Sequence, residues 1–159
     1  MTDKRDLQAR AKQLINSEYT MALASSGENG PWVAPVYYVF YQGAMYFFSK
    51  QNSRHISESL KAGNAAATIY PFVCSWQEIK GVQMIGRVRS AGIGFTAIQA
   101  VRAYNAKFRF TKEFFEPGEA LDLEAFVKRF RVKLYSFNPD KIFFLDNQIR
   151  FGFREEVIF

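Results

Sequence analysis

The sequence contains very few soft metal ligands and no long apolar run. Cys74 is the only cysteine and His55 the only histidine in 159 residues. A disulfide within the chain is therefore excluded, a zinc site of the usual Cys and His kind is not expected, and a reducing compartment fits the composition. No stretch approaches the ~20 apolar residues of a membrane span, and the chain begins with charged residues rather than an apolar signal core. We therefore expect a cytoplasmic protein with no membrane partner.

Aromatic and apolar residues, in contrast, are abundant. The chain is 48% hydrophobic and 17% aromatic, with 17 Phe and 8 Tyr, which is far more than a disordered chain carries. No repeat, linker or low-complexity tract interrupts it, and its length suits one hydrophobic core. We expect residues 1–159 to form a single domain.

Positive charge is concentrated in the middle of the chain. The net charge is +6, and residues 29–112 contain ten Lys or Arg against two acids, Glu58 and Glu78. Such a distribution is typical of a protein with an anionic partner, such as a phosphate-bearing cofactor, nucleic acid or a membrane surface. A surface charge that only aids solubility is the equal alternative.

Residue periodicity predicts a mainly β (α+β) fold. Apolar spacing and capping residues predict helices over 3–15, 53–62, 95–108 and 121–130. Alternating or β-branched runs between turn signals predict strands over 19–24, 32–41, 44–49, 65–70, 78–90, 132–137, 142–145 and 149–153. Gly81 and Gly86 mark bulges or close approaches in the long strand over 78–90. Six to eight antiparallel strands with a few short helices indicate a barrel or a sandwich.

The segment SKQNSRH, residues 49–55, carries the clearest chemical signal. It leaves a strand and enters a helix, so the hydroxyls of Ser49 and Ser53, the cations Lys50 and Arg54, and the free N–H groups of a helix start meet there. These groups together predict an anion site of phosphate size. The alternative is an ordinary Ser-capped surface helix with solvated cations.

The pattern around this segment resembles a known family. Two aromatics and Ser49 end a hairpin strand, Ser53-Arg54 opens a helix, and Gly63-Asn64 closes that helix before a strand of small residues, 65–67. This order is similar to the flavin-binding signature of the pyridoxamine 5'-phosphate oxidase-like FMN-binding split barrels. Several shorter motifs resemble the YhbP-like bacterial subgroup: Ser53-Arg54-His55, Lys80 to Gln83, Tyr104-Asn105 with Phe108, and Asp146-Asn147 with Phe151 to Phe153.

The resemblance implies an antiparallel split β-barrel that binds FMN at a homodimer interface. The FMN phosphate would meet Ser49, Arg54 and His55, with His55 standing where the oxidases have Lys. The backbone of the strand over 32–41 would lie along the isoalloxazine ring, with Gln83 nearby. With the anion site, the candidate cofactor-binding residues are Ala34, Pro35, Val36, Ser49, Lys50, Ser53, Arg54, His55 and Gln83.

Two departures argue against a genuine pyridoxamine phosphate oxidase. The oxidases have a Gln five residues before the strand glycine that corresponds to Gly86, whereas this chain has Gly81 there and Gln83 only three residues before it. Their C-terminal Arg-Leu-His substrate signature also has no match. We therefore expect an FMN-dependent oxidoreductase whose substrate and electron donor the sequence does not name, in which the flavin performs the redox chemistry.

Three alternatives remain open at this stage. A flavin-binding protein without turnover would carry the same signature. A haem protein would have to use His55 as its ligand, and one His with one Cys is a poor metal set. A basic barrel that binds nucleic acid would need outward aromatics beside the Lys128 to Lys133 run, which instead has the pattern of a solvated face.

Overall fold

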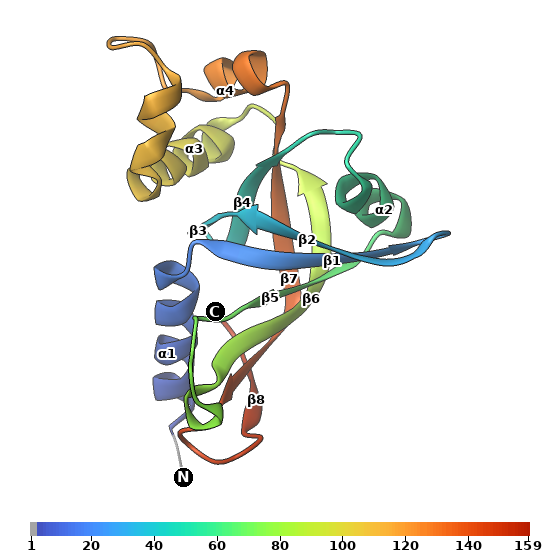
Figure 1. Cartoon of the computed structure of the whole chain (residues 1–159), viewed down its shortest axis with the longest axis vertical. Coiled ribbons are helices and arrows are strands. Elements are labelled where there is room, and N and C mark those ends of the chain that lie inside the picture. Colours follow the sequence, from blue (N-terminus) through green and yellow to red (C-terminus); the bar gives the residue numbers. More distant parts are fainter. Residues whose placement is uncertain (1–2) are drawn as a thin grey trace.

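Eight strands form one antiparallel sheet that curls into a split barrel (Figure 1). The computed structural model describes residues 3–159. Along the sheet the strands follow the order β2-β1-β5-β6-β7-β4-β3, and β8 pairs with β7. Their bounds are β1 Thr20–Gly27, β2 Gly30–Tyr37, β3 Val39–Tyr41, β4 Ala44–Ser49, β5 Ala65–Ile69, β6 Lys80–Ser90, β7 Lys133–Asp146 and β8 Arg154–Val157.

The two ends of the strand path, β2 and β3, are neighbours in sequence. Only Tyr38 separates them, and its side chain is fully buried, with its hydroxyl donating to the Ile15 carbonyl at 2.5 Å. The sheet therefore curls far enough that its two end strands, β2 and β3, directly precede and follow Tyr38 in the chain.

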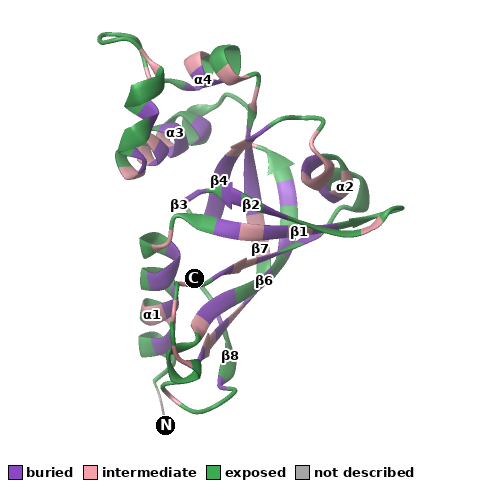
Figure 2. Cartoon of the chain, viewed as in Figure 1, coloured by how far each residue is buried: buried purple, intermediate pink, exposed green. Residues whose placement is uncertain are grey.

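Two helices supply side chains to the core of the barrel. Asp3 accepts a hydrogen bond from the Arg5 N–H and caps α1 (Lys4–Ser17), as predicted. The predicted helix over 53–62 is α2 (Arg54–Ala62), which ends at Gly63 in the left-handed conformation. The buried side chains of α1 and Ile56 of α2 belong to the same core cluster as the inward residues of the sheet, the purple segments in Figure 2. Each large apolar side chain buried there contributes ~1.5–3 kcal/mol.

A helical insertion joins β6 to β7 and carries a second core. It consists of α3 (Phe95–Lys107), the 3-10 helix η2 (Arg109–Phe114) and α4 (Leu123–Phe130), and it lies beyond one end of the barrel (Figure 1). Phe48 of β4 stacks on Phe126 of α4 at 4.6 Å and meets Tyr104 edge-on at 5.2 Å. Aromatic contacts of this kind, rather than strand pairing, attach the insertion to the sheet. A further 3-10 helix, η1, spans Trp76–Glu78.

Four of the predicted strands differ from the structure. The predicted strand over 32–41 is broken at Tyr38, where the chain passes from β2 to β3. The predicted strands 132–137 and 142–145 are one continuous strand, β7. Its pairing with β6 continues past Pro139 because the register shifts between Ile85, which pairs with Lys141, and Gly86, which pairs with Pro139. The predicted strand 149–153 is a turn, and the final strand is β8.

Gly86 makes the register shift possible. A Cβ at this position would lie 2.2 Å from the Asn138 carbonyl oxygen and 2.8 Å from Cα of Pro139. The predicted close approach at Gly86 is therefore confirmed. None of the helices within residues 3–159 is both long and apolar enough to cross a membrane.

Candidate functional site

Two hydroxyls and the only imidazole of the chain meet at the corner between β4 and α2. Nε2 of His55 lies 2.8 Å from Oγ of Ser49 and 3.4 Å from Oγ of Ser53, and the two hydroxyl oxygens are 3.0 Å apart. Ser49 is buried, whereas Ser53 and His55 are half-buried. All three residues belong to the cofactor site expected from the sequence, and the structure brings them together; we call them the corner cluster.

The start of α2 keeps backbone donors available beside this cluster. Ser53 occupies the N-cap position, but its hydroxyl donates to the Lys50 carbonyl at 2.7 Å instead of accepting from the first turn of the helix. The N–H groups of Arg54 and His55 consequently have no hydrogen-bond partner among residues 3–159. Unpaired N–H groups at a helix start, combined with hydroxyl donors, are a favourable environment for an anion.

Burial affects the protonation of His55 in the corner cluster. Desolvation lowers the pKa of His55 below its ordinary value, so the free protein holds a neutral imidazole at pH 7. An anion that approached Nε2 would favour the protonated form. The cluster can therefore exchange a proton when an anion binds.

Arg54 is directed mainly toward the β1–β2 hairpin. Its Nε donates to Glu58 at 2.6 Å, and Nη2 donates to the Asn29 and Gly30 carbonyls at 3.1 and 2.9 Å. The guanidinium also lies over the Trp32 ring at 4.8 Å. Hydrogen bonds from Arg54 and then Ser25 lower the pKa of Glu58, so this carboxylate stays charged. Arg54 and Glu58 thus form an ion pair one helical turn apart, and only Nη1 of Arg54 has no acceptor within residues 3–159.

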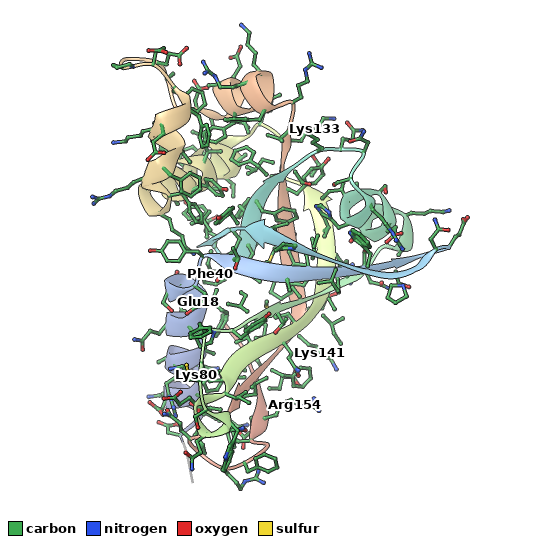
Figure 3. The ribbon with its side chains drawn as sticks, in the orientation of Figure 1. Glu18, Phe40, Lys80, Lys133, Lys141 and Arg154 are labelled. Carbon is green, nitrogen blue, oxygen red and sulfur yellow. The ribbon has the colours of Figure 1, made fainter. Side chains whose placement is uncertain are left out.

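Two lysines flank the corner. Lys50 follows Ser49 directly and is exposed. Lys133 lies opposite Ser49 in the β4–β7 register, so the side chains of Lys133 and Ser49 share one face of the sheet. Figure 3 shows Lys133 where β7 begins. The sequence analysis missed Lys133 because it assigned the whole basic run to a solvated face. Only the pairing of β4 with β7 reveals this cation.

The residues Ala34, Pro35 and Val36 lie on β2, a strand with a free edge. The Tyr38 N–H donates to the Tyr19 carbonyl at 3.2 Å, so alternation along the ladder directs the backbone groups of Ala34 and Val36 toward β1. The backbone of Pro35 faces the free edge instead. A ring lying along this edge would meet the groups of Pro35 and of its odd-numbered neighbours.

Prolines occupy two of the edge-facing positions of β2. Pro31 and Pro35 stand opposite Ser26 and Ala22, at positions that form no ladder hydrogen bond with β1. The free edge therefore offers carbonyl acceptors along its length but N–H donors only at Val33 and Tyr37. This is a discontinuous row of donors.

Gln83 lies on the outer face of the sheet, away from the inward-facing corner cluster. Its Oε1 is 3.5 Å from Nη1 of Arg154, and its neighbours in the register are Thr68 and Phe143. At Gly81, the position where the oxidases have Gln, a Cβ would lie 2.8 Å from the Ile69 carbonyl. The backbones of Gly81 and Ile69 approach too closely for a side chain at position 81. Because Gln83 lies on the outer face, one chain alone does not bring it to the corner cluster.

Comparison with known proteins establishes the fold. No family model matches the chain, and no curated protein matches its sequence. Among solved structures, it is similar to Campylobacter jejuni ChuZ, with a TM-score of 0.75 and 15% identity over 99% of this chain and 61% of that one. A heme binding protein from Mycobacterium smegmatis gives a TM-score of 0.71 and 13% identity over 99% and 58%. A FAD-binding protein from Mesorhizobium loti gives 0.62 and 16% over 84% and 90%. The chain is an α+β split barrel and spans about three fifths of the length of the first two.

Proposed function

We propose that this protein binds FMN, with the phosphate held at the corner cluster. The observation that carries the proposal is the meeting of Ser49, Ser53 and His55 with two unpaired backbone N–H groups at the start of α2. Hydroxyl, imidazole and backbone donors around one point suit the several oxygens of a phosphate. The shared fold of a FAD-binding and a heme binding protein supports a cofactor role for this architecture.

The same residues fit a phosphate better than a haem iron. Nε2 of His55 already lies at hydrogen-bond distance from Oγ of Ser49. In the proposed site Lys50 and Nη1 of Arg54 add positive charge, and the stretch from Ala34 to Val36 lies along the flavin ring, with the backbone of Pro35 facing it. When bound, FMN would supply hydride or electron transfer.

The proposal includes a homodimer that brings Gln83 to the flavin of the other subunit. The outer face of β1, β2, β5 and β6 exposes apolar side chains: Val33 and Ile85 are 59% and 53% exposed, and small side chains such as Ala22, Ala24 and Ala66 line the same face. A shallow hollow of about 400 Å³ on this face includes Ala22, Ala66 and Gln83 in its lining. An obligate two-fold dimer would bury more than ~2,000 Å² in total.

For the reaction we propose an FMN-dependent oxidoreductase other than pyridoxamine phosphate oxidase. Arg150 is the only cation in the turn where the oxidases carry their substrate signature, and Gly81 leaves no room for their Gln. Turnover of pyridoxine or pyridoxamine phosphate by the FMN-saturated protein in air, near the ~1–10³ s⁻¹ of native substrates, would refute this part.

Titration of FMN into the purified protein, followed by quenching of flavin fluorescence, tests the cofactor. Replacement of Ser53 by Ala should weaken FMN at least about fivefold, since a hydrogen bond to a charged group is lost. The matched control is Ser57→Ala on the same helix, because that exposed hydroxyl donates to the Arg54 carbonyl and should not affect FMN. No binding of FMN, or a stoichiometric haem complex instead, would overturn the assignment. A monomer mass in light scattering at micromolar concentration would refute the dimer.

A further inference from the structure

Lys107, the last residue of α3, is a half-buried cation without a counter-ion. Its Nζ donates to the Glu18 carbonyl at 2.5 Å and lies over the rings of Tyr38, Phe108 and Tyr19 at 4.3, 5.5 and 5.6 Å. Within residues 3–159 no ion pair involves Lys107, although an ammonium group has three donors. Two of its N–H groups are therefore available to a ligand.

The aromatic surroundings leave this ammonium group partly desolvated and without an ion pair among residues 3–159. Desolvation lowers the pKa of Lys107 to about 8, against a weaker opposing effect of the Glu18 carboxylate. A partly desolvated cation without a paired anion is unfavourable, and charge interactions are stronger away from bulk water. A bound anion would remove the imbalance, whereas an exposed lysine would gain little.

An exposed aromatic surface adjoins Lys107. Tyr37 lies 5.4 Å from Phe108 and 5.5 Å from Phe110, measured between ring centroids, and Phe108 lies 5.8 Å from Tyr19. Tyr37 and Phe110 are 50% and 38% exposed, although each could have been buried in so aromatic a chain. The rings come from the α1–β1 connection, the end of β2 and the segment from the end of α3 into η2.

We propose that Lys107 and the exposed rings of Tyr19, Tyr37 and Phe110, which pack around the buried ring of Phe108, bind a planar aromatic anion, such as an aromatic carboxylate, as the substrate class of this protein. The rings supply apolar and stacking contacts, and the ammonium group supplies the charge. The substrate assignment rests on the proposed function, since Tyr37 is the last residue of the strand whose free edge is assigned to the flavin ring. The binding site itself does not depend on it.

The test uses 2-naphthoate as the probe, with binding measured by calorimetry on FMN-free and FMN-saturated protein. Lys107→Met should weaken 2-naphthoate at least about tenfold, while neutral 2-naphthalenemethanol changes less than about twofold. Phe110→Ala should weaken both compounds about fivefold. The control is Phe151→Ala, which removes an exposed ring from the turn between β7 and β8 and should change neither.

The outcomes separate this site from the cofactor assignment. Binding of 2-naphthoate that depends on Phe110 in the FMN-free protein supports the site, whether or not FMN binds. Absence of binding, or equal affinity in the wild type and Phe110→Ala, overturns it even if Lys107→Met fails to fold. A change of oligomer mass in Phe110→Ala without any binding of 2-naphthoate would show that a second copy covers these rings, and would also overturn it.

Discussion

Replacement of Arg54 by Ala should weaken FMN at least tenfold, through the one part of the guanidinium that the protein leaves unpaired. Nε and Nη2 are engaged by Glu58 and by the Asn29 and Gly30 carbonyls, so only the two N–H groups of Nη1 remain for a phosphate. One charge-assisted hydrogen bond from Nη1 would contribute ~1.5–3 kcal/mol, and 1.4 kcal/mol corresponds to a factor of about ten in affinity. The remaining bonds of Arg54 hold the hairpin, so thermal stability should fall as well.

A second variant separates phosphate binding from support of the hairpin. Glu58→Gln removes a negative charge near the site while it keeps an amide oxygen for Ser25, so FMN should bind no more weakly than to the wild type. Riboflavin, which lacks the phosphate, should bind the wild type and Arg54→Ala equally. FMN and riboflavin would be titrated by fluorescence quenching, with folding checked by circular dichroism. Unchanged FMN affinity in folded Arg54→Ala would refute the reasoning.

Three further predictions follow from other contacts. Because burial lowers the pKa of His55 and a phosphate would raise it, FMN should bind more tightly as the pH falls from about 8 to 6.5, and His55→Gln should flatten this dependence in the same titration. Gly86→Ala should lower the free energy of unfolding in urea by about 3 kcal/mol or more, since its Cβ would meet backbone at 2.2 Å, whereas Gly94→Ala, with no atom within 4 Å, should change it by less than about 1 kcal/mol. Folding lowers the pKa of Lys107 from 10.5 to about 8, so between pH 8 and 10.5 the unfolded chain binds more protons than the folded protein. In urea titrations over this range, the free energy of unfolding of the wild type relative to Lys107→Met should therefore rise with pH, by at most ~1.4 kcal/mol per pH unit. An equal pH slope in both proteins would contradict this prediction.

Local sequence signals predicted the parts of the fold that depend on neighbouring residues. Asp3 caps α1 and Gly63 ends α2 because a capping side chain and a left-handed glycine act within one turn of a helix. The break at Tyr38 has no such signal, because the buried hydroxyl finds its acceptor in α1, and the continuous β7 depends on Gly86 in another strand. These features arise from pairing between distant segments.

In the candidate site, too, residues close in sequence could be predicted together, whereas contacts between distant segments could not. Ser49, Ser53 and His55 lie within seven consecutive residues of the sequence, so a motif could place them together. The carbonyl partners of Arg54 are 24 and 25 residues away, and the rings around Lys107 come from residues up to 88 positions distant. Lys133 was passed over because its relation to Ser49 exists only in the β4–β7 register.

The prolines on the free edge of β2 also affect how the protein behaves at high concentration. An exposed edge strand normally acts as a template onto which another strand can add, which is the first step of sheet extension and fibril growth. Pro31 and Pro35 lack the N–H groups that such a strand would need at alternate positions. The edge therefore resists the addition of another polypeptide strand, so replacing both prolines should promote aggregation from the folded state.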